Sequence, residues 1–144
     1  MKIEKMNISH INSVQEIENI SFENPWSHDS IEKDINNLSS INFVCKVDEQ
    51  IVGYSMGWMI KKEFQLNNIC ITRDFRKKKY GYLLLKHLLQ VLAVLKCEKV
   101  FLEVDQENYK AIGLYNKAGF IVSYIRKRYY NNGNDALVMH KNIM

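Results

Sequence analysis

The sequence predicts an α/β fold of the α+β kind, in which one mixed, mostly antiparallel sheet carries helices on both faces. Three observations predict it. The spacing of apolar residues changes repeatedly between the helical and the strand period. Three strand-like runs follow one another with no helix between them, as in an antiparallel meander. Helices and strands then alternate, so the expected order is β-α-α-β-β-β-α-β-α-β-β.

The N-terminal part is expected to contain a short strand and two helices. Residues 3–5 alternate as in a strand, and residues 8–22 carry apolar side chains at the helical period. The sequence Asn24-Pro25-Trp26 interrupts this helix. Ser27 can cap a second helix that runs to about Leu38.

The middle of the chain reads as three strands, at residues 42–47, 51–60 and 64–72. The acidic and polar residues 48–50 connect the first two as a hairpin. After them we expect a long helix at about 80–96, a strand at 99–104 and a helix at 108–118 that Gly119 closes. A last pair of strands follows, with Asn132-Gly133 as its turn.

Length and composition fit one domain over residues 1–144. The chain has 144 residues, of which 47% are hydrophobic, within the usual domain size of roughly 100–150 residues. Cys45, Cys70 and Cys97 are odd in number and far apart, so their spacing indicates neither disulfide pairs nor a zinc site. We therefore expect no metal and a reduced, cytoplasmic setting.

The apolar segments and the net charge bear on targeting and on partners. The first residues lack the apolar stretch of a signal peptide, and Lys86, His87 and Gln90 interrupt the most apolar segment, so we expect no membrane span. A net charge of +4 favours anionic partners. It is too small to require direct nucleic-acid binding.

A run of cations precedes the long helix: Arg76-Lys77-Lys78-Lys79-Tyr80-Gly81. Free backbone N–H groups at a helix start can hold a phosphate. Each exposed lysine there opposes the helix dipole by roughly 0.3–1 kcal/mol, a cost that a bound phosphate would reverse. The alternative is a solvated corner of the molecule, and the local pattern leaves both open.

Two nucleotide motifs are absent, and one hydrolase motif matches in the wrong context. The chain has neither a Walker loop nor a dinucleotide glycine triplet. Gly53-Tyr54-Ser55-Met56-Gly57 fits the Gly-x-Ser-x-Gly nucleophile elbow, which needs a turn between strand and helix. Here the segment lies inside a strand run, where glycines indicate a bulge or a close backbone approach.

Glu103, Asn108 and Tyr115 form the other candidate group. Asn108 and Tyr115 are two helical turns apart, about 10.5 Å at 1.5 Å per residue, so they share one face of their helix. Glu103 lies at the end of the preceding strand. An edge carboxylate, an ordinary helix cap and a packed tyrosine would explain the same three residues without any chemistry.

These motifs identify a resemblance that extends over essentially the whole chain. Residues 108–120 match the pattern Asn-x-x-Ala-x-x-Leu-Tyr-x-x-x-Gly-Phe in full, and residues 76–81 align with Arg-Gly-x-Gly-x-Gly, with Lys77 and Lys79 in place of the first two glycines. Both patterns are typical of the GNAT superfamily of acyl-CoA-dependent N-acetyltransferases. Segments 22–27, 68–71, 102–104 and 128–130 resemble more narrowly the ribosomal-protein-alanine N-acetyltransferases. Asp105 stands where those enzymes often have arginine.

The resemblance implies a GNAT fold with acetyl-CoA as cosubstrate and assigns roles to particular residues. Glu103 would be the general base, acting through water, and Tyr115 the general acid at the departing sulfur. Four residues would shape the groove for the acceptor: Pro25, Trp26, Tyr129 and Tyr130. The cosubstrate would contact Ile69, Cys70 and Ile71 at its thioester and pantetheine arm, Arg76, Lys77, Lys78, Lys79, Tyr80, Gly81 and Tyr82 at its pyrophosphate, and also Asn108.

The expected function is transfer of the acetyl group of acetyl-CoA to the N-terminal α-amine of a protein, with the alanine of a small-subunit ribosomal protein as first candidate. An α-amine, with a pKa near 7.7–8.0, is easier to free for attack than lysine near 10.4, by about 3.4 kcal/mol. One alternative is acetylation of a lysine side chain or a small amine. Another is a non-catalytic module that binds acyl-CoA or associates with RNA.

Overall fold

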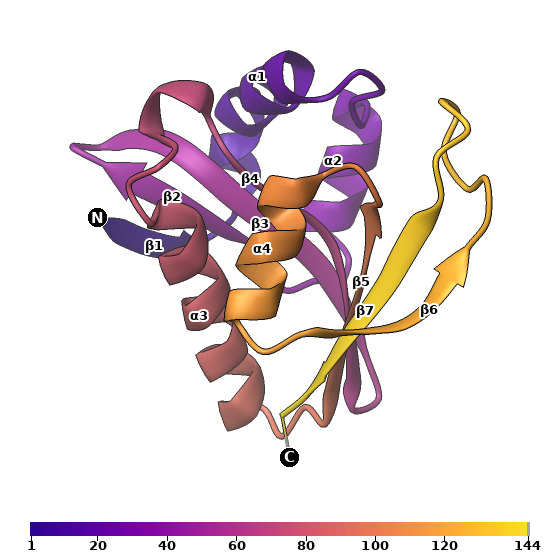
Figure 1. Ribbon diagram of the computed structural model, residues 1–144. Coiled ribbons are helices and arrows are strands. Elements are labelled where there is room, and N and C mark those ends of the chain that lie inside the picture. Colours follow the sequence, from indigo (N-terminus) through magenta and orange to yellow (C-terminus); the bar gives the residue numbers. More distant parts are fainter. Residues whose placement is uncertain (144) are drawn as a thin grey trace.

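The computed structural model describes residues 1–143 as one seven-stranded sheet in the order β1-β2-β3-β4-β5-β7-β6 (Figure 1). The β4–β5 pair is parallel and every other neighbouring pair is antiparallel. The prediction of a mixed, mostly antiparallel sheet is therefore confirmed. The strands are β1 (Lys2–Lys5), β2 (Phe43–Val47), β3 (Gln50–Ile60), β4 (Glu63–Ile71), β5 (Lys99–Asp105), β6 (Ile121–Arg126) and β7 (Ala136–Asn142).

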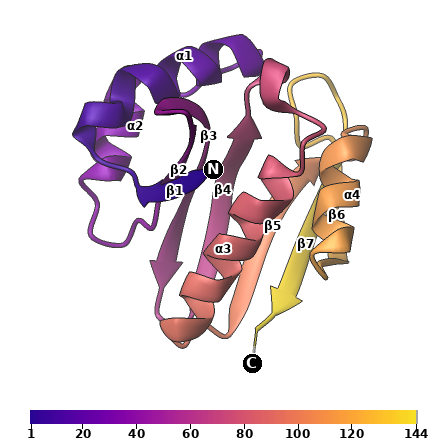
Figure 2. The same cartoon turned by 90° about the vertical axis from the view of Figure 1, so that its left-hand side faces the viewer.

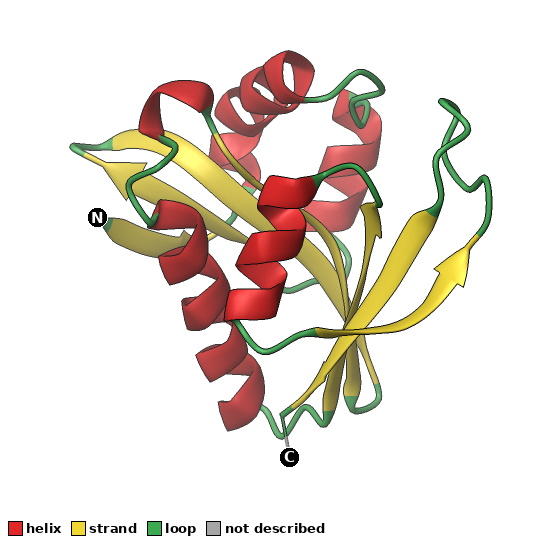
Figure 3. Ribbon diagram, in the orientation of Figure 1, coloured by secondary structure: helices red, strands yellow, loops and turns green. Residues whose placement is uncertain are grey.

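Four α-helices flank this sheet in the predicted chain order (Figure 3). Short 3₁₀ turns precede α1 and follow β4. Among the described residues, no helix has both the length and the apolar character needed to cross a bilayer. The helices are α1 (Ile11–Ser21), α2 (His28–Ile35), α3 (Tyr80–Val94) and α4 (Tyr109–Lys117).

The start of α2 was predicted correctly and its end was not. Ser27 caps the helix, since its side chain accepts from Ser30 N–H at 3.1 Å. The helix ends at Ile35, before the predicted Leu38. The Asn37 side chain accepts from Ser39 N–H at 2.8 Å, and this local turn competes with a further helical turn. Leu38 is fully exposed, so no apolar contact extends the helix.

Helices cover both faces of the sheet, as the sequence predicts. The helices α1 and α2 pack on one face, and α3 and α4 pack on the other (Figure 2). On the first face Val14 and Ile31 lie against Val44, Tyr54 and Met56. On the second, buried residues of α3 and α4 meet the other side of the strands: Leu85, Leu88, Leu92 and Tyr115 against Phe64, Val100, Leu102 and Met139.

The last two strands are not joined by a tight Asn132-Gly133 hairpin turn, and that prediction is wrong. Their ladder ends at the Arg126–Ala136 pair, and residues 127–135 form a long connection. Asn132-Gly133 lies within it, in a turn closed by Gly133 N–H on Tyr130 O at 2.9 Å. The Asn132 and Asn134 side chains donate to the Asp105 carboxylate at 3.2 and 3.0 Å, and these contacts hold the connection against the end of β5.

The pairing between β4 and β5 ends early, and this positions the site. The ladder covers only four pairs, from Glu63–Lys99 to Leu66–Leu102. At that point the register of β3 on β4 shifts, so that Met56 pairs with Asn68 and Gly57 with Leu66. The extra residue, Asn67, makes a bulge that bends β4. From there to Ile71 and Asp105, the two strands run on without pairing to each other.

Gly57 and Ser55 show why the Gly-x-Ser-x-Gly match is structural. A Cβ atom on Gly57 would lie 2.2 Å from the Phe64 ring and 2.5 Å from the Gln65 carbonyl oxygen. The glycine thus permits the close approach of β3 and β4, as predicted. Ser55 is fully buried inside β3, so it is not on an exposed elbow between strand and helix.

Candidate active site

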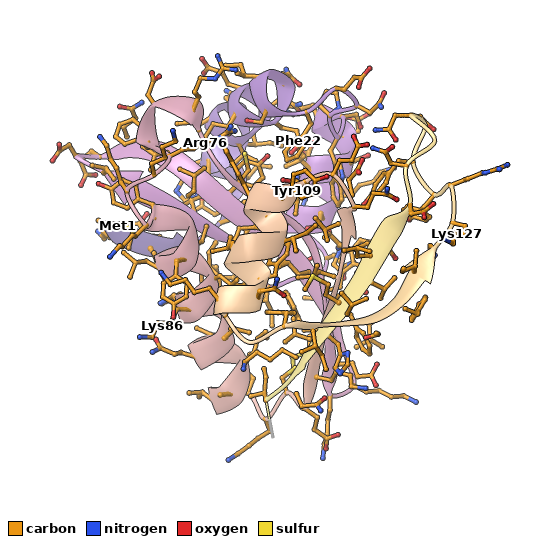
Figure 4. The ribbon with its side chains drawn as sticks, viewed as in Figure 1. Met1, Phe22, Arg76, Lys86, Tyr109 and Lys127 are labelled. Carbon is orange, nitrogen blue, oxygen red and sulfur yellow. The ribbon has the colours of Figure 1, made fainter. Side chains whose placement is uncertain are left out.

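Two adjoining cavities open where β4 and β5 diverge. The first, of about 330 Å³, lies between the ends of these strands, and we call it the acidic cavity. The second, of about 480 Å³, lies between the end of β4 and the starts of α3 and α4, and we call it the basic cavity. Four residues line both of them: Phe22, Ile69, Asn108 and Ala111. Figure 4 shows Phe22, Arg76 and Tyr109 grouped at this end of the molecule.

The charges of the two cavities are opposite in sign, which gives each its name. In the part of the chain that the structure describes, the acidic cavity is lined by three carboxylates and no basic side chain: Glu18, Glu103 and Asp105. The basic cavity is lined by five cationic side chains and no acidic one: Arg76, Lys77, Lys79, Lys110 and Lys117. Of these two adjoining cavities, the basic one therefore favours an anion and the acidic one a cation.

The turn before α3 keeps a glycine-like backbone although lysines occupy it. Lys77 and Lys79 have φ angles of +64° and +67°, in the left-handed region that favours glycine. These are the positions of the first two of the three glycines in the aligned pattern. The Arg76 side chain steadies the turn, since its Nε donates to Ile71 O at 2.8 Å. Compared with the glycine-containing pattern, this turn thus has the same left-handed backbone at both positions and two additional positive charges.

Free N–H groups at the start of α3 face the same cavity. Leu83 N–H bonds Lys79 O at 3.0 Å, so the N–H groups of Tyr80, Gly81 and Tyr82 precede the hydrogen-bond ladder of the helix. All three residues line the basic cavity. Together with the cations, these are the kinds of group that hold a phosphate in proteins. Lys78 is the one predicted member of the turn that does not line this cavity, because its ammonium lies over the Phe75 ring at 5.4 Å.

The free edge of β4 turns main-chain groups toward the gap. Thr72 N–H donates to Val52 O at 2.8 Å, and Cys70 pairs with Tyr54, so these two residues bond toward β3. Because bonding direction alternates along an antiparallel strand, the N–H and C=O groups of Ile69 and Ile71 point the other way, toward β5. Cys70 also lines the basic cavity, and burial raises the pKa of its thiol.

Glu103 lines the acidic cavity from β5, beside cationic and aromatic groups. Its carboxylate lies 3.8 Å from the Arg126 guanidinium, which in turn lies over the Tyr129 ring at 5.4 Å. The Glu103 carboxylate raises the pKa of the Tyr129 hydroxyl, through a hydrogen bond and through its charge. The Glu103 side chain is 23% exposed, so water reaches it.

Tyr115 and Asn108 face the same hollow from α4. Tyr115 is 7% exposed, and its ring packs against Phe120 with centroids 5.9 Å apart. Burial, and then the neighbouring Tyr130 and Cys70, raise the pKa of Tyr115 above its ordinary value, so its hydroxyl keeps its proton. Asn108 caps α4, since its side chain accepts from Ala111 N–H at 3.3 Å.

Of the four residues predicted to shape an acceptor groove, the structure brings two into the acidic cavity. Trp26 and Tyr130 line it. Pro25 lines instead a separate surface hollow of about 520 Å³ that Trp26 and Trp58 also border. Tyr129 is half exposed and meets Tyr130 edge to face, with centroids 5.1 Å apart. Tyr129 thus packs on one of the residues that line the cavity, and neither Tyr129 nor Pro25 lines it.

Asp105 fastens the segment that carries Tyr130. Its carboxylate accepts from Glu107 N–H at 3.0 Å and from the Asn132 and Asn134 side chains. Burial raises the pKa of Asp105, but these hydrogen bonds outweigh it and hold that pKa below its ordinary value. A second hydrogen bond joins the same connection to the residue after β5, since Asp135 N–H donates to the Gln106 side chain at 2.9 Å.

Sequence reasoning missed Glu18, Asn67 and Asn68, which also line the acidic cavity. Glu18 had a detectable signal. It follows Ile11 by seven residues and Val14 by four, so it lies on the apolar face of α1 and is the acid on that face. The sequence contains no signal for the bulge at Asn67, because that bulge depends on how β3 pairs with β4.

Comparison with known proteins agrees with this geometry. Residues 11–120 match the family model described as Acetyltransferase (GNAT) family. A Bacillus subtilis protein provisionally named a ribosomal protein bS18-alanine N-acetyltransferase is 33% identical over 95% of this chain and 92% of its own length. The Salmonella typhimurium enzyme of that name is 30% identical over 69% of both chains.

Solved structures give the same result. The crystal structure of the ribosomal-protein-S18-alanine N-acetyltransferase from Escherichia coli superposes with a TM-score of 0.93 and 26% identity, over 99% of this chain and 93% of that one. The opposite charges of the two cavities, the family match and the likeness of the folds lead to one conclusion. The chain belongs to the GNAT family of acetyltransferases.

Proposed function

We propose that this protein transfers the acetyl group of acetyl-CoA to the N-terminal α-amine of a protein. The observation that carries the proposal is the pair of adjoining cavities of opposite charge. The basic cavity suits the phosphates of coenzyme A, and the acidic cavity suits a protonated amine. Glu103 and Tyr115 line the acidic cavity, close to the residues shared by both.

The residues present fit acetyl-CoA. Arg76, Lys77 and Lys79, together with the N–H groups at the start of α3, would hold the pyrophosphate, and Lys78 would contribute its backbone. The main chain of Ile69 and Ile71 faces the gap and would line the pantetheine arm and thioester, with Cys70 and Asn108 beside it. Acetyl-CoA supplies an activated acyl group and a thiolate as leaving group.

In the proposed reaction, the amine nitrogen forms a bond to the acyl carbon as the bond from that carbon to sulfur breaks. Glu103 takes one proton of the ammonium through a water molecule before the attack, and the second proton, which the nitrogen loses after the attack, passes to the departing thiolate. The N–H groups of β4 that face the gap donate to the oxygen on which negative charge develops. Tyr115 donates a hydrogen bond to the departing sulfur. The amine attacks directly, and no acyl-enzyme forms.

An N-terminal amine suits this site better than a lysine. At neutral pH the α-amine, with a pKa near 7.7–8.0, is far easier to deprotonate than a lysine near 10.4, so a single carboxylate acting through water is sufficient. The relatives with printed substrates act on the alanine of ribosomal protein bS18. We therefore propose the N-terminal alanine of a small-subunit ribosomal protein as acceptor. The three cysteines are buried and free, which supports a reduced, cytoplasmic setting.

The test is release of free thiol from acetyl-CoA with two matched peptides. One begins with a free alanine and contains no lysine, and the other has a blocked N-terminus and one internal lysine. Turnover on the first alone supports the proposal. Turnover on the second alone would replace it with lysine acetylation. Binding of acetyl-CoA with no turnover on any amine would instead indicate a module that binds acyl-CoA.

A further inference from the structure

Glu18 is a buried carboxylate with no role in the reaction described above. It lies on α1 with 2% of its surface exposed. Its Oε2 accepts from Trp26 N–H at 2.9 Å, and its Oε1 accepts from the Asn68 side chain at 2.7 Å. The Tyr54 hydroxyl also donates to Oε1. These contacts join α1, the loop that carries Trp26, and β3 and β4.

The hydrogen bonds of Glu18 are those that an ionised carboxylate makes. Both of its oxygens accept, as they do in an ionised carboxylate, and neither needs a proton of its own. Burial and the bond to Glu18 raise the pKa of the Tyr54 hydroxyl, so Tyr54 remains the donor. All three partners of Glu18 are neutral groups.

Glu18 has no cationic partner within residues 1–143. The ion pairs of the described chain involve other carboxylates. A buried charge is costly unless an opposite charge accompanies it. Three hydrogen bonds occupy three of the roughly four acceptor positions of a carboxylate. In the described chain no cation accompanies this carboxylate, and Glu18 lines the acidic cavity, where a cationic ligand would reach it.

The position of Glu18 indicates what it attracts. Its partner Trp26 belongs to the acceptor side of the cavity, and its partner Asn68 directly precedes Ile69, whose main chain faces the gap. Glu18 thus lies between the loop that would contact the acceptor and the strand that would hold the thioester. Glu103 lines the same cavity from the other strand, β5.

We propose that Glu18 is a substrate-positioning residue whose fixed negative charge holds the protonated α-ammonium of the acceptor in the acidic cavity before Glu103 removes its proton. This rests on the proposed function and adds a second carboxylate to it. Acetylation turns the ammonium into a neutral amide, so the attraction ends with the reaction and the product is released.

The experiment compares Glu18→Gln with Glu16→Gln, a control at an exposed acid on the same helix. Each protein is titrated at pH 6.5, where the α-amine is mostly protonated, with one alanine-starting peptide in its free and its N-acetylated form. Acetyl-CoA binding is measured in parallel by calorimetry. We expect Glu18→Gln to weaken binding of the free-amine peptide about tenfold or more, the scale of one charge-assisted contact.

The other expected results separate a charge effect from a structural one. The N-acetylated peptide and acetyl-CoA should bind Glu18→Gln within about twofold of the original protein, and KM for the free-amine peptide should rise more than kcat falls. Glu16→Gln should change nothing. An equal loss for both peptides, or an unchanged preference for the free amine, overturns the proposal.

Two further outcomes also test the proposal: a Glu18→Gln variant that does not fold, and an original protein that acetylates no N-terminal peptide. If Glu18→Gln does not fold, the double variant Glu103→Gln/Asp105→Asn removes the other two carboxylates of the cavity. A preference for the free-amine peptide that survives in it supports Glu18, and its loss overturns the proposal. If the original protein acetylates no N-terminal peptide, the proposed function fails and this inference fails with it. Turnover with an unaltered KM in Glu18→Gln removes the inference alone.

Discussion

Replacing Tyr115 with phenylalanine tests the role proposed for this hydroxyl at the departing sulfur. An ordinary tyrosine near pKa 10 is a weaker acid than a thiol near 8.5, so full proton transfer to the thiolate is uphill by about 2 kcal/mol. Burial raises the pKa of Tyr115 further, which makes the transfer less favourable still. The hydroxyl is therefore expected to stabilise the thiolate by a hydrogen bond and to keep its proton in the transition state.

The expected loss follows from that role. A hydrogen bond to a charged group contributes about 1.5–3 kcal/mol, so kcat should fall about 10- to 150-fold in Tyr115→Phe. The ring remains and keeps its contact with Phe120, so stability and acetyl-CoA affinity should change little. Tyr109→Phe is the matched control, because Tyr109 lies on the same helix but is 77% exposed.

The assay is the initial rate of thiol release at saturating acetyl-CoA and peptide, measured from pH 7 to pH 9. Tyr115→Phe should lower the whole profile without moving its shape, since the hydroxyl does not titrate in this range. An unchanged kcat would remove Tyr115 from the mechanism. A loss beyond about 10⁴-fold, together with a changed pH profile, would show full proton transfer and refute the hydrogen-bonding role.

Three other predictions concern the scaffold and the basic turn. In thermal scans, Gly57→Ala should lower Tm by about 10 °C, because the added methyl group overpacks against Phe64 and the Gln65 carbonyl at a cost of roughly 3 kcal/mol. Gly113→Ala is the control: it adds a methyl group in open space on a helix and should raise Tm by about 2–3 °C. Because the pKa of Asp105 is lowered in the folded state, its contribution to stability is present above about pH 4 and is lost as pH falls further. Limited proteolysis of residues 127–135 should therefore speed up below pH 4, and less so in Asp105→Asn. Lys77→Ala/Lys79→Ala should weaken acetyl-CoA binding at low salt, with a smaller effect at 1 M salt, and an effect independent of salt would contradict the electrostatic role.

Local patterns made most of the fold predictable. The helical period of α1, the cap at Ser27 and the alternation of β5 act within a few residues, so the sequence alone indicates them. The connection between β6 and β7 was not predictable in this way. Asn132-Gly133 is a strong local turn signal, but the hydrogen bonds from Asn132 and Asn134 to Asp105 cross a separation of more than twenty residues.

The site shows the same division. Glu103 and Tyr115 could be placed from strand order, helical spacing and the family pattern, and the structure brings both to one cavity. The left-handed backbone of Lys77 and Lys79 could not be read from lysine, which disfavours it. The Glu18 carboxylate accepts hydrogen bonds from groups 8, 36 and 50 residues away, so no local pattern shows its partners.

The short ladder between β4 and β5 is the joint between the two halves of the sheet. In the sheet itself, four residue pairs connect the half built on β1 to β4 with the half built on β5 to β7, and the core under α3 and α4 also spans both halves. Beyond Leu66, main-chain groups of β4 have no neighbouring strand on the β5 side. A molecule that spans this joint binds the native state alone and so adds its binding free energy to folding. Occupancy of the active site and the cohesion of the two halves are consequently one coupled property of this protein.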